Sequence, residues 1–205
     1  MNNFYYKQNR DRGFTLIEML VSLSLFTIVI TISVGAFLSL LGASGGVQSK
    51  QSVMTTLTFA LDSMTREIRT GRSYNCQPAA TLKASNQESY GDTTVNCDTG
   101  NTGLSFKEAG SSVTGSTATR ISYYFDTATA TNTIMRRVGN NTPQSIIADG
   151  IKITNLKFFV TGTDRLNDVG SDSKQSTVTI ILEAQDETGA STTLQTTVTQ
   201  RELDI

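Results

Sequence analysis

The stretch from Phe14 to Leu41 constrains the fold of this chain more than any other feature. Within it Glu18 is the sole charged residue, and the remaining positions are large apolar residues broken by small ones such as Ser24 and Gly35. As a helix, with a rise of about 1.5 Å per residue, the stretch is roughly 40 Å long, whereas the hydrocarbon core of a bilayer is about 30 Å thick. A buried helix of a soluble domain rarely needs so long an uncharged run. The sequence therefore predicts a membrane-spanning helix.

The charges on either side of this stretch predict its orientation. Before it stand Lys7, Arg10 and Arg12, opposed by Asp11, and the first basic residue after it is Lys50. Positive residues stay on the cytoplasmic side, so we expect a cytoplasmic N-terminus and an extracytoplasmic remainder.

A cleavable secretory signal is the alternative interpretation of the same stretch. The small residues at 43–45 are typical of a signal-peptidase site. However, the apolar run is longer than the usual signal core, and it carries an acid near its cytoplasmic end. Both features favour a retained helix.

The acid itself, Glu18, needs a partner, because an unpaired carboxylate in the membrane costs about 2.5 to 3.5 kcal/mol. If the chain were cut between Gly13 and Phe14, the new α-amino group of Phe14 would lie one helical turn from Glu18, or beside Glu18 of a neighbouring copy. Amine and acid would then neutralise each other as helices assemble. In the alternative, Glu18 sits at the membrane interface and its carboxylate reaches water. The residues alone leave both interpretations open.

The run Gly13-Phe14-Thr15-Leu16-Ile17-Glu18 after a short basic leader resembles the class III signal of type IV prepilins and pseudopilins. In that family a membrane aspartyl peptidase cuts after the glycine and methylates the new N-terminus, and the acid at the fifth mature position aids docking into a helical filament. The resemblance implies that Gly13 is the last leader residue, Phe14 the methylated N-terminus and Glu18 the docking acid. Major pilins often have a proline where this chain has Gly35, which favours a pseudopilin or a minor subunit.

Beyond the apolar run, the glycine-rich segment 42–46 is a poor helix former, and it predicts either a hinge or locally melted stretch, or a simple linker. An amphipathic helix is expected next. Its apolar positions recur every three or four residues and comprise Met54, Leu57, Leu61, Met64 and Ile68. Such a stripe packs on a sheet, and we assign it no ligand. Gly71 is the expected stop.

From about Ser73 the composition shifts to Thr, Ser, Asn and Gly with short apolar alternations, which predicts strands. Residues 119–125 and 133–138 are expected to form a hairpin, 151–161 a strand, and 176–185 with 191–201 a second hairpin around the reversal at 186–189. In the last hairpin Val178, Ile180, Leu182 and Ala184 share one face. We expect one antiparallel sheet of four to six strands.

Together with the resemblance, these patterns predict an α+β, pilin-like fold in which a long N-terminal helix packs on an antiparallel β-sheet head. The expected segments are a leader over 1–13, a transmembrane or filament-core helix over 14–41, the amphipathic half of the helix over 42–72, and an extracytoplasmic head over 73–205.

The cysteines Cys76 and Cys97 both fall in the expected extracytoplasmic head. A cysteine pair in a small secreted domain is usually a disulfide, and a loop of this size would contribute about 3 kcal/mol while pinning the polar segment 77–96. Metal binding is the alternative, but two thiolates without any histidine make a poor site.

The chemistry-bearing residues predict a non-catalytic protein without a cofactor. The chain has no histidine, which removes the commonest general base, and the glycines at 110–115 lack the lysine and spacing of a phosphate loop. A weak calcium candidate consists of Asp164, Asn167, Asp168 and Asp172. Their spacing does not match an EF-hand, and a solvated loop is the favoured interpretation.

Arg136 and Arg137, with Tyr123 and Tyr124 on the expected neighbouring strand, are a candidate nucleic-acid contact for a DNA-uptake pilus. A formal net charge of -1 provides no basic footprint, so the interpretation we favour is exposed charge on a strand.

The resemblance implies a structural subunit of a type IV pilus or type II secretion pseudopilus, most like the larger minor pseudopilins of the J class or minor pilins of the W type, which are thought to prime assembly at the filament tip. Its expected partners are the prepilin peptidase and N-methyltransferase, other pilins or pseudopilins, the inner-membrane assembly platform and the membrane itself. Two alternatives stay open: a pilus-borne adhesin or DNA receptor, and a signal-anchored surface protein that never polymerises.

Overall fold

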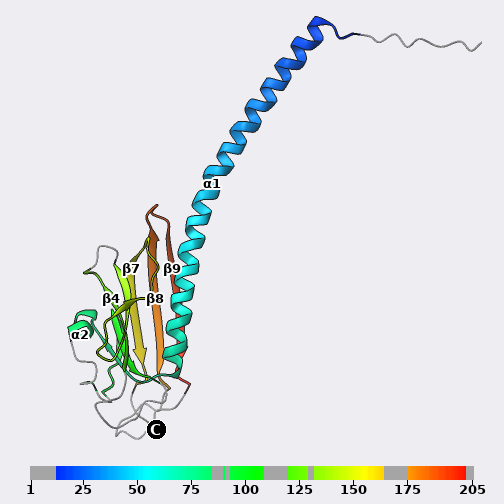
Figure 1. Cartoon of the computed structure of the whole chain (residues 1–205). Helices are drawn as coiled ribbons and strands as arrows, with labels where there is room; N and C mark the ends of the chain where they lie inside the picture. The colour runs from blue at the N-terminus through cyan, green and yellow to red at the C-terminus, as the bar shows by residue number, and fades with distance from the viewer. Residues whose placement is uncertain are drawn as a thin grey trace, which may run out of the picture. The chain divides into compact units, whose positions relative to one another are not determined.

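A computed structural model describes residues 13–84, 90, 93–108, 120–128, 132–163 and 175–201. The chain divides into two compact units, residues 1–46 and 47–205. The elements, labelled in Figure 1, are α1 (Leu16–Thr70), β1 (Arg72–Gln77), α2 (Ala79–Ala84), β2 (Cys97–Asn101), β3 (Gly103–Lys107), β4 (Arg120–Asp126), β5 (Thr133–Val138), β6 (Gln144–Ser145), β7 (Ile151–Thr161), β8 (Thr177–Asp186) and β9 (Ser191–Thr199). The fold is α+β with a long N-terminal helix and antiparallel sheets, as the sequence predicts.

Helix α1 is unbroken through the glycine-rich segment 42–46. The expectation of a locally melted stretch there is therefore wrong, whereas those of a hinge and of a linker stay predictions. A Cβ atom at Gly42, Gly45 or Gly46 would meet no atom within 4 Å. These glycines are consequently not required by packing within the chain, and each costs the helix about 1 kcal/mol relative to alanine.

The C-terminal part of α1, from residue 47 on, belongs to the second unit and buries one stripe against the sheets of that unit. The buried residues are Val53, Leu57, Ala60, Leu61, Met64 and Ile68. Met54, which the sequence pattern places in the stripe, is instead 52% exposed, and Val53 takes its place. With 3.6 residues per turn, the position four residues before Leu57 falls nearer the buried face than the position three residues before it.

Gly71 ends the helix as predicted, because α1 stops at Thr70 and β1 begins at Arg72. The helix end packs directly on β3 at this point. A Cβ atom at position 71 would collide with the ring of Phe106. Close approach, rather than an unusual backbone conformation, thus accounts for the glycine.

The strands form two sheets, where the sequence predicted one sheet of four to six strands. Their orders are β1-β3-β4-β5-β6 and β2-β7-β8-β9, and every pair within them is antiparallel. The predicted hairpins β4–β5 and β8–β9 and the strand β7 are all present. The division into two sheets was missed because local alternation identifies strands but does not specify which distant strand each one pairs with.

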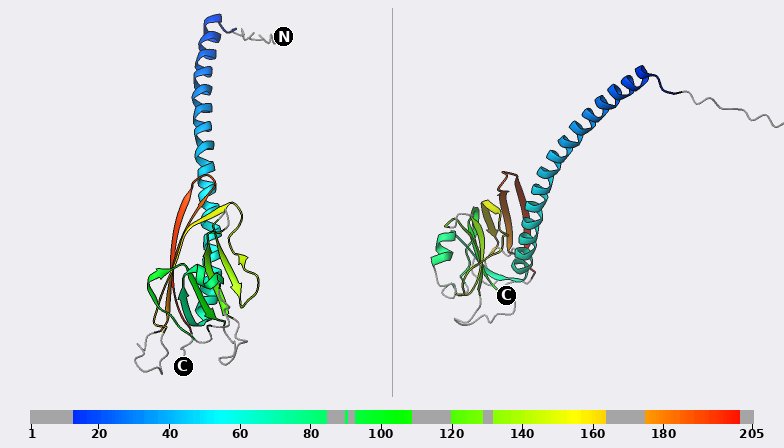
Figure 2. Two further views of the ribbon diagram at one scale, coloured as in Figure 1. Left: turned by 90° about the vertical axis from the view of Figure 1, so that its left-hand side faces the viewer. Right: turned by 45° about the horizontal axis from the view of Figure 1, so that its top comes forward.

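One core joins α1 to both sheets. It includes Met64 of α1, Tyr123 of β4 and Phe158 of β7, and in β8 it includes the predicted face of Val178, Ile180, Leu182 and Ala184. In both views of Figure 2 the sheets lie beside the C-terminal part of α1. The amphipathic stripe is therefore buried by a two-sheet head.

The short helix α2, absent from the sequence prediction, covers the other face of the five-stranded sheet. Its residue Leu82 is fully buried, and its C-terminal carbonyl groups at Leu82 and Lys83 accept hydrogen bonds from the Arg137 guanidinium at 2.6 and 3.3 Å. Lys83 also pairs with Asp126 of β4 at 3.0 Å. Burial alone would raise the pKa of Asp126, but the Ala128 N–H and the Lys83 ammonium lower it overall. These contacts bury both faces of β4.

The predicted disulfide is present between Cys76 of β1 and Cys97 of β2, with their Cα atoms 5.9 Å apart. Because β1 and β2 belong to different sheets, the bond links the two sheets covalently. Both cysteines are buried in the shared core.

A polar cluster attaches α1 to the five-stranded sheet. The Glu67 carboxylate accepts hydrogen bonds from the Tyr123 hydroxyl at 2.5 Å and from the Arg136 guanidinium at 3.0 and 2.9 Å. Burial, followed by the bond to Glu67, raises the pKa of Tyr123, and the bond to Glu67 raises that of Arg136. At neutral pH the Tyr123 phenol is thus protonated and the Arg136 guanidinium charged, so both remain donors to Glu67.

This arrangement predicts that Glu67→Ala destabilises the head by about 2 kcal/mol, because it leaves Tyr123 and Arg136 without their acceptor. The matched control is Asp62→Ala, which removes the exposed Asp62–Arg66 pair of the same helix and should cost less than about 1 kcal/mol. Urea unfolding of the detergent-solubilised protein, followed by near-UV circular dichroism of the tyrosines, measures both. Equal midpoints for the two variants would contradict the proposed role of the cluster.

The disulfide yields a second prediction. A Cys76→Ala/Cys97→Ala variant should lose about 3 kcal/mol of head stability, because the unfolded chain regains the freedom of the closed loop. Urea midpoints of the variant and of the oxidised protein give the difference. Dithiothreitol should lower the urea midpoint of the unaltered protein by a similar amount. It should leave the midpoint of the variant unchanged.

Candidate functional site

The candidate site is the start of α1, where the sequence predicts a peptidase signal. Gly13, Phe14 and Thr15 precede the helix and are exposed, with Phe14 77% accessible. The Gly13–Phe14 peptide bond thus lies outside helical structure. A peptidase can engage such a bond without first unwinding a helix.

Thr15 caps the helix. Its hydroxyl oxygen accepts a hydrogen bond from the Glu18 N–H at 3.3 Å, and its carbonyl accepts bonds from the N–H groups of Glu18 and Met19 at 3.1 and 3.2 Å. A threonine followed three residues later by glutamate is the sequence pattern of a capping box. The cap fixes the helix start two residues after the Gly13–Phe14 bond.

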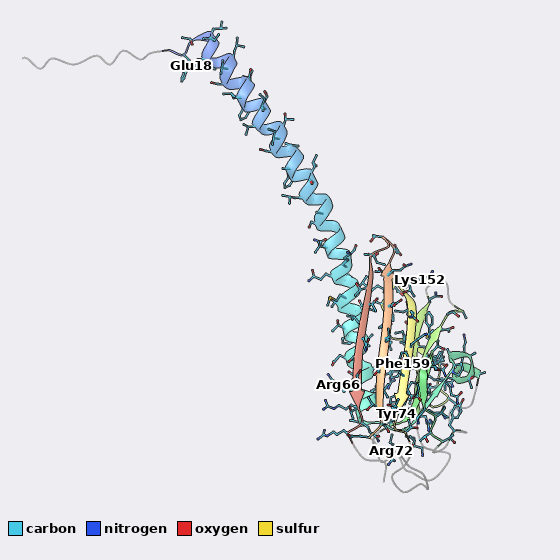
Figure 3. All side chains as sticks on the ribbon, turned by 180° about the vertical axis from the view of Figure 1, so that it is seen from behind. Glu18, Arg66, Arg72, Tyr74, Lys152 and Phe159 are labelled. Carbon is cyan, nitrogen blue, oxygen red and sulfur yellow. A yellow bond between two sulfur atoms is a disulfide. The ribbon has the colours of Figure 1, made fainter. Side chains whose placement is uncertain are left out.

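Glu18 lies in the first turn of α1 (Figure 3), and it is the acidic residue of that turn. A carboxylate is stabilised there because the helix N-terminus carries partial positive charge. An added α-amino group on Phe14 would place a further positive charge at the same end. Glu18 therefore lies in the turn where both positive charges would be found.

Nothing in the described chain requires a glycine at position 13. A Cβ atom there would meet no atom within 4 Å, and the backbone is not in the left-handed region. The fold gives no reason for the residue. A requirement for a small side chain would have to come from a molecule that binds this segment.

The first unit exposes an apolar surface on all sides of the helix. Its large residues from Leu16 to Leu41 are 44% to 79% accessible, and an 18-residue window reaches a mean hydropathy of 2.3 with none of it buried. Serine and threonine hydroxyls in this part donate to backbone carbonyls one turn earlier, as Ser24 does to Leu20 and Thr31 to Thr27. These bonds satisfy the hydroxyl protons where no water is available. The helix is long and apolar enough to cross a membrane.

Residues 8–34 match the family described as the prokaryotic N-terminal methylation motif. The match spans the Gly13–Phe14 bond, the Thr15 cap and Glu18. No curated protein and no solved structure matches the chain. The motif and the exposed apolar helix together support a membrane-anchored, pilin-like structural protein.

The other residues singled out from the sequence do not gather into a site among the described residues. Tyr123 and Arg136 bond to Glu67, while Tyr124 and Arg137 are buried beside α2. The expectation of strand-exposed charge is therefore wrong for Arg137, which is buried, whereas the Arg136 side chain is 29% exposed and paired with Glu67. Both guanidinium groups of the candidate nucleic-acid contact are thus engaged within the head. The calcium candidate of Asp164, Asn167, Asp168 and Asp172 lies outside the described residues.

Sequence reasoning missed Thr15. The signal was available, because Thr15 and Glu18 have the spacing of a capping box immediately before an apolar run. The same tetrapeptide that carries the acid thus also defines where the helix begins.

Proposed function

We propose that this chain is a non-catalytic structural subunit of a type IV pilus or type II secretion pseudopilus. It is made as a precursor, cut between Gly13 and Phe14 by a prepilin peptidase, methylated on Phe14 and assembled through its N-terminal helix. The observation that carries the proposal is the match of residues 8–34 to the methylation motif. The exposed Gly13–Phe14 bond and the glycine that the fold itself does not need support it.

The assembly step follows from the surface of α1. The apolar residues of the first unit are covered by no other part of the described chain, so they require lipid or other helices around them. The free-energy cost of leaving the bilayer is offset when the helices of neighbouring subunits cover this surface. Small residues such as Gly35, Gly42 and Gly45 have open space at their Cβ positions, which permits close helix approach.

Glu18 decides whether such packing is tolerated. An unpaired carboxylate among apolar helices is costly, whereas pairing with a protonated α-amino group offsets part of that cost. Cleavage after Gly13 creates that amine one turn away. Processing and assembly are thereby coupled through a single ion pair, within one subunit or between neighbours.

The orientation that we propose has the N-terminus in the cytoplasm and the head outside. The basic residues before α1 favour it. The disulfide between Cys76 and Cys97 also favours it, because such bonds persist in oxidising compartments. We further propose a minor subunit that primes the filament tip, on the strength of Gly35 and of the resemblance to minor pseudopilins and minor pilins.

Processing is tested by mass spectrometry of the protein from cells that contain a prepilin peptidase. We expect an N-terminal Phe14 with one additional methyl group. Gly13→Leu should abolish cleavage without changing the thermal unfolding of the head, because no atom contacts the position. Gly35→Ala, a similar change within the helix, should be cleaved normally. An intact leader in the unaltered protein, or normal cleavage of Gly13→Leu, would refute the proposal.

Assembly is tested with variants of Glu18. Glu18→Ala and Glu18→Gln should be processed normally but should enter sheared filaments at least tenfold less than the unaltered chain, because the amine loses its counter-charge. Glu18→Asp should recover part of the loss, and Ser24→Ala, which removes an internally bonded hydroxyl, should have no effect. Immunoblots of filament and membrane fractions measure the ratio. Normal filament entry by Glu18→Ala would instead favour a surface protein that does not polymerise.

A further inference from the structure

A groove runs between α1 and the edge strand β9, within the second unit. One wall carries Arg66 and Arg69 of α1, and the other carries Thr196–Thr199 and Arg201. Its volume is about 770 Å³, within the range of about 300 to 1,000 Å³ that is typical of ligand clefts. Figure 3 shows Arg66 beside the C-terminal end of β9. We call this feature the α1–β9 groove.

The backbone of β9 presents a row of donors and acceptors on the side away from β8. The Asp186 N–H bonds to the Ala190 carbonyl and the Gln200 N–H to the Ser176 carbonyl, in the same register as the β8–β9 ladder. Bonded and non-bonded pairs alternate along an antiparallel ladder, so the even-numbered residues of β9 bond to β8 and the odd-numbered ones point outward. The hydroxyls of Thr179 and Thr197, an opposed pair, lie 2.9 Å apart, as expected for a non-bonded pair.

The outward row meets α1 just beyond the C-terminal end of β9. The Arg201 N–H, which continues the odd-numbered series, donates to the Arg69 carbonyl at 2.8 Å and closes the groove at this end. Thr197 and Thr199, the preceding members of the odd-numbered series, line the groove, so their outward backbone groups lie at its edge. Among the described residues β9 pairs with no strand except β8.

This edge differs from the other sheet edges of the head. Strands β1 and β2 each contain a register shift, and β6 has two residues, whereas β9 runs for nine residues in continuous register. Proteins normally shorten, bulge or charge their edge strands to prevent pairing with other chains. The sequence of β9 has no proline and no charged residue. It is thus the one described edge that retains the form required for pairing.

The charge of the groove favours acidic extended peptides over basic ones. Arg66, Arg69 and Arg201 provide three guanidinium groups against the single carboxylate of Asp62, although the whole chain has a formal net charge of -1. The Arg66–Asp62 pair is well exposed, with side chains 79% and 65% accessible, so its mutual attraction is weak. A carboxylate entering the groove can compete for Arg66 and bind Arg69.

We propose that the α1–β9 groove is a docking site for an extended acidic peptide segment of another protein. The segment adds to β9 as a further strand, and Thr197 and Thr199 provide the main-chain hydrogen bonds. Alternate side chains of the segment point toward α1, where carboxylates meet the guanidinium groups of Arg66 and Arg69. A peptide fits better than a nucleic acid, because the outward N–H and C=O groups of β9 can pair with the C=O and N–H groups of a peptide backbone. The inference goes beyond the proposed filament role and does not depend on it.

The test uses the full chain in detergent and a fluorescein-labelled peptide of alternating threonine and glutamate, with binding followed by fluorescence anisotropy. We expect saturable binding, and at least tenfold weaker binding when lysine replaces glutamate in the peptide. The Arg66→Glu/Arg69→Glu variant should bind the acidic peptide at least tenfold more weakly than the unaltered chain. These two results test the charge of the groove.

A proline pair tests the strand pairing. Thr197→Pro removes an outward N–H inside the groove, so this variant should bind the acidic peptide at least fivefold more weakly. Thr193→Pro removes an outward N–H of the same strand beyond the groove lining and should leave binding unchanged. Proline is tolerated where the missing N–H faces outward, so both variants should fold, as near-UV circular dichroism would verify.

Several outcomes would overturn the proposal. These are absence of saturable binding at millimolar peptide, equal binding of the acidic and basic peptides, and equal effects of the two proline substitutions. Labelled single-stranded DNA that binds more tightly than the acidic peptide, through the same arginines, would likewise overturn it and would identify an electrostatic nucleic-acid site.

Discussion

The packing of the α1 stripe against two sheets is the interaction on which the head depends. Neither sheet closes a core by itself, because each would expose its inner face. The stripe from Val53 to Ile68 contributes side chains to one cluster that contains residues of both sheets. The Cys76–Cys97 bond joins the sheets, and Glu67 fastens the helix to one of them. Burial of apolar area supplies most of the stabilisation. The polar and covalent links hold the helix and the two sheets in one relative position.

One helix therefore serves two kinds of surroundings. From Leu16 to Leu41 its surface is apolar on all sides, and from Val53 onward it is apolar on one side only. An all-round apolar helix suits lipid or a bundle of helices, whereas a one-sided stripe suits the surface of a head. At its start, Thr15 defines the first turn and Glu18 supplies the acid within it. The proposed function uses this start, and the head provides surfaces such as the α1–β9 groove for other contacts.

Much of the fold could be predicted from local patterns. The β8 alternation of Val178, Ile180 and Leu182 and the stop at Gly71 are both local, and both are correct in the structure. Errors arose where the outcome depended on distant partners. Arg136 looks like an exposed strand residue in the sequence, but Glu67 lies 69 positions away and binds it. The exchange of Met54 for Val53 in the stripe is the exception, because the helical repeat alone accounts for it.

The sequence by itself determined the apolar helix, the acid five residues past Gly13, the cysteine pair and most of the strands, because periodicity, charge and turn residues act over short distances. The tertiary structure decided that the strands form two sheets, that the disulfide links them, that α2 buries Tyr124, and that β9 keeps an open edge beside Arg66. Each of these depends on which segments meet across long separations. Pairing of that kind is set by the total burial and hydrogen bonding of the whole head, which no single segment encodes.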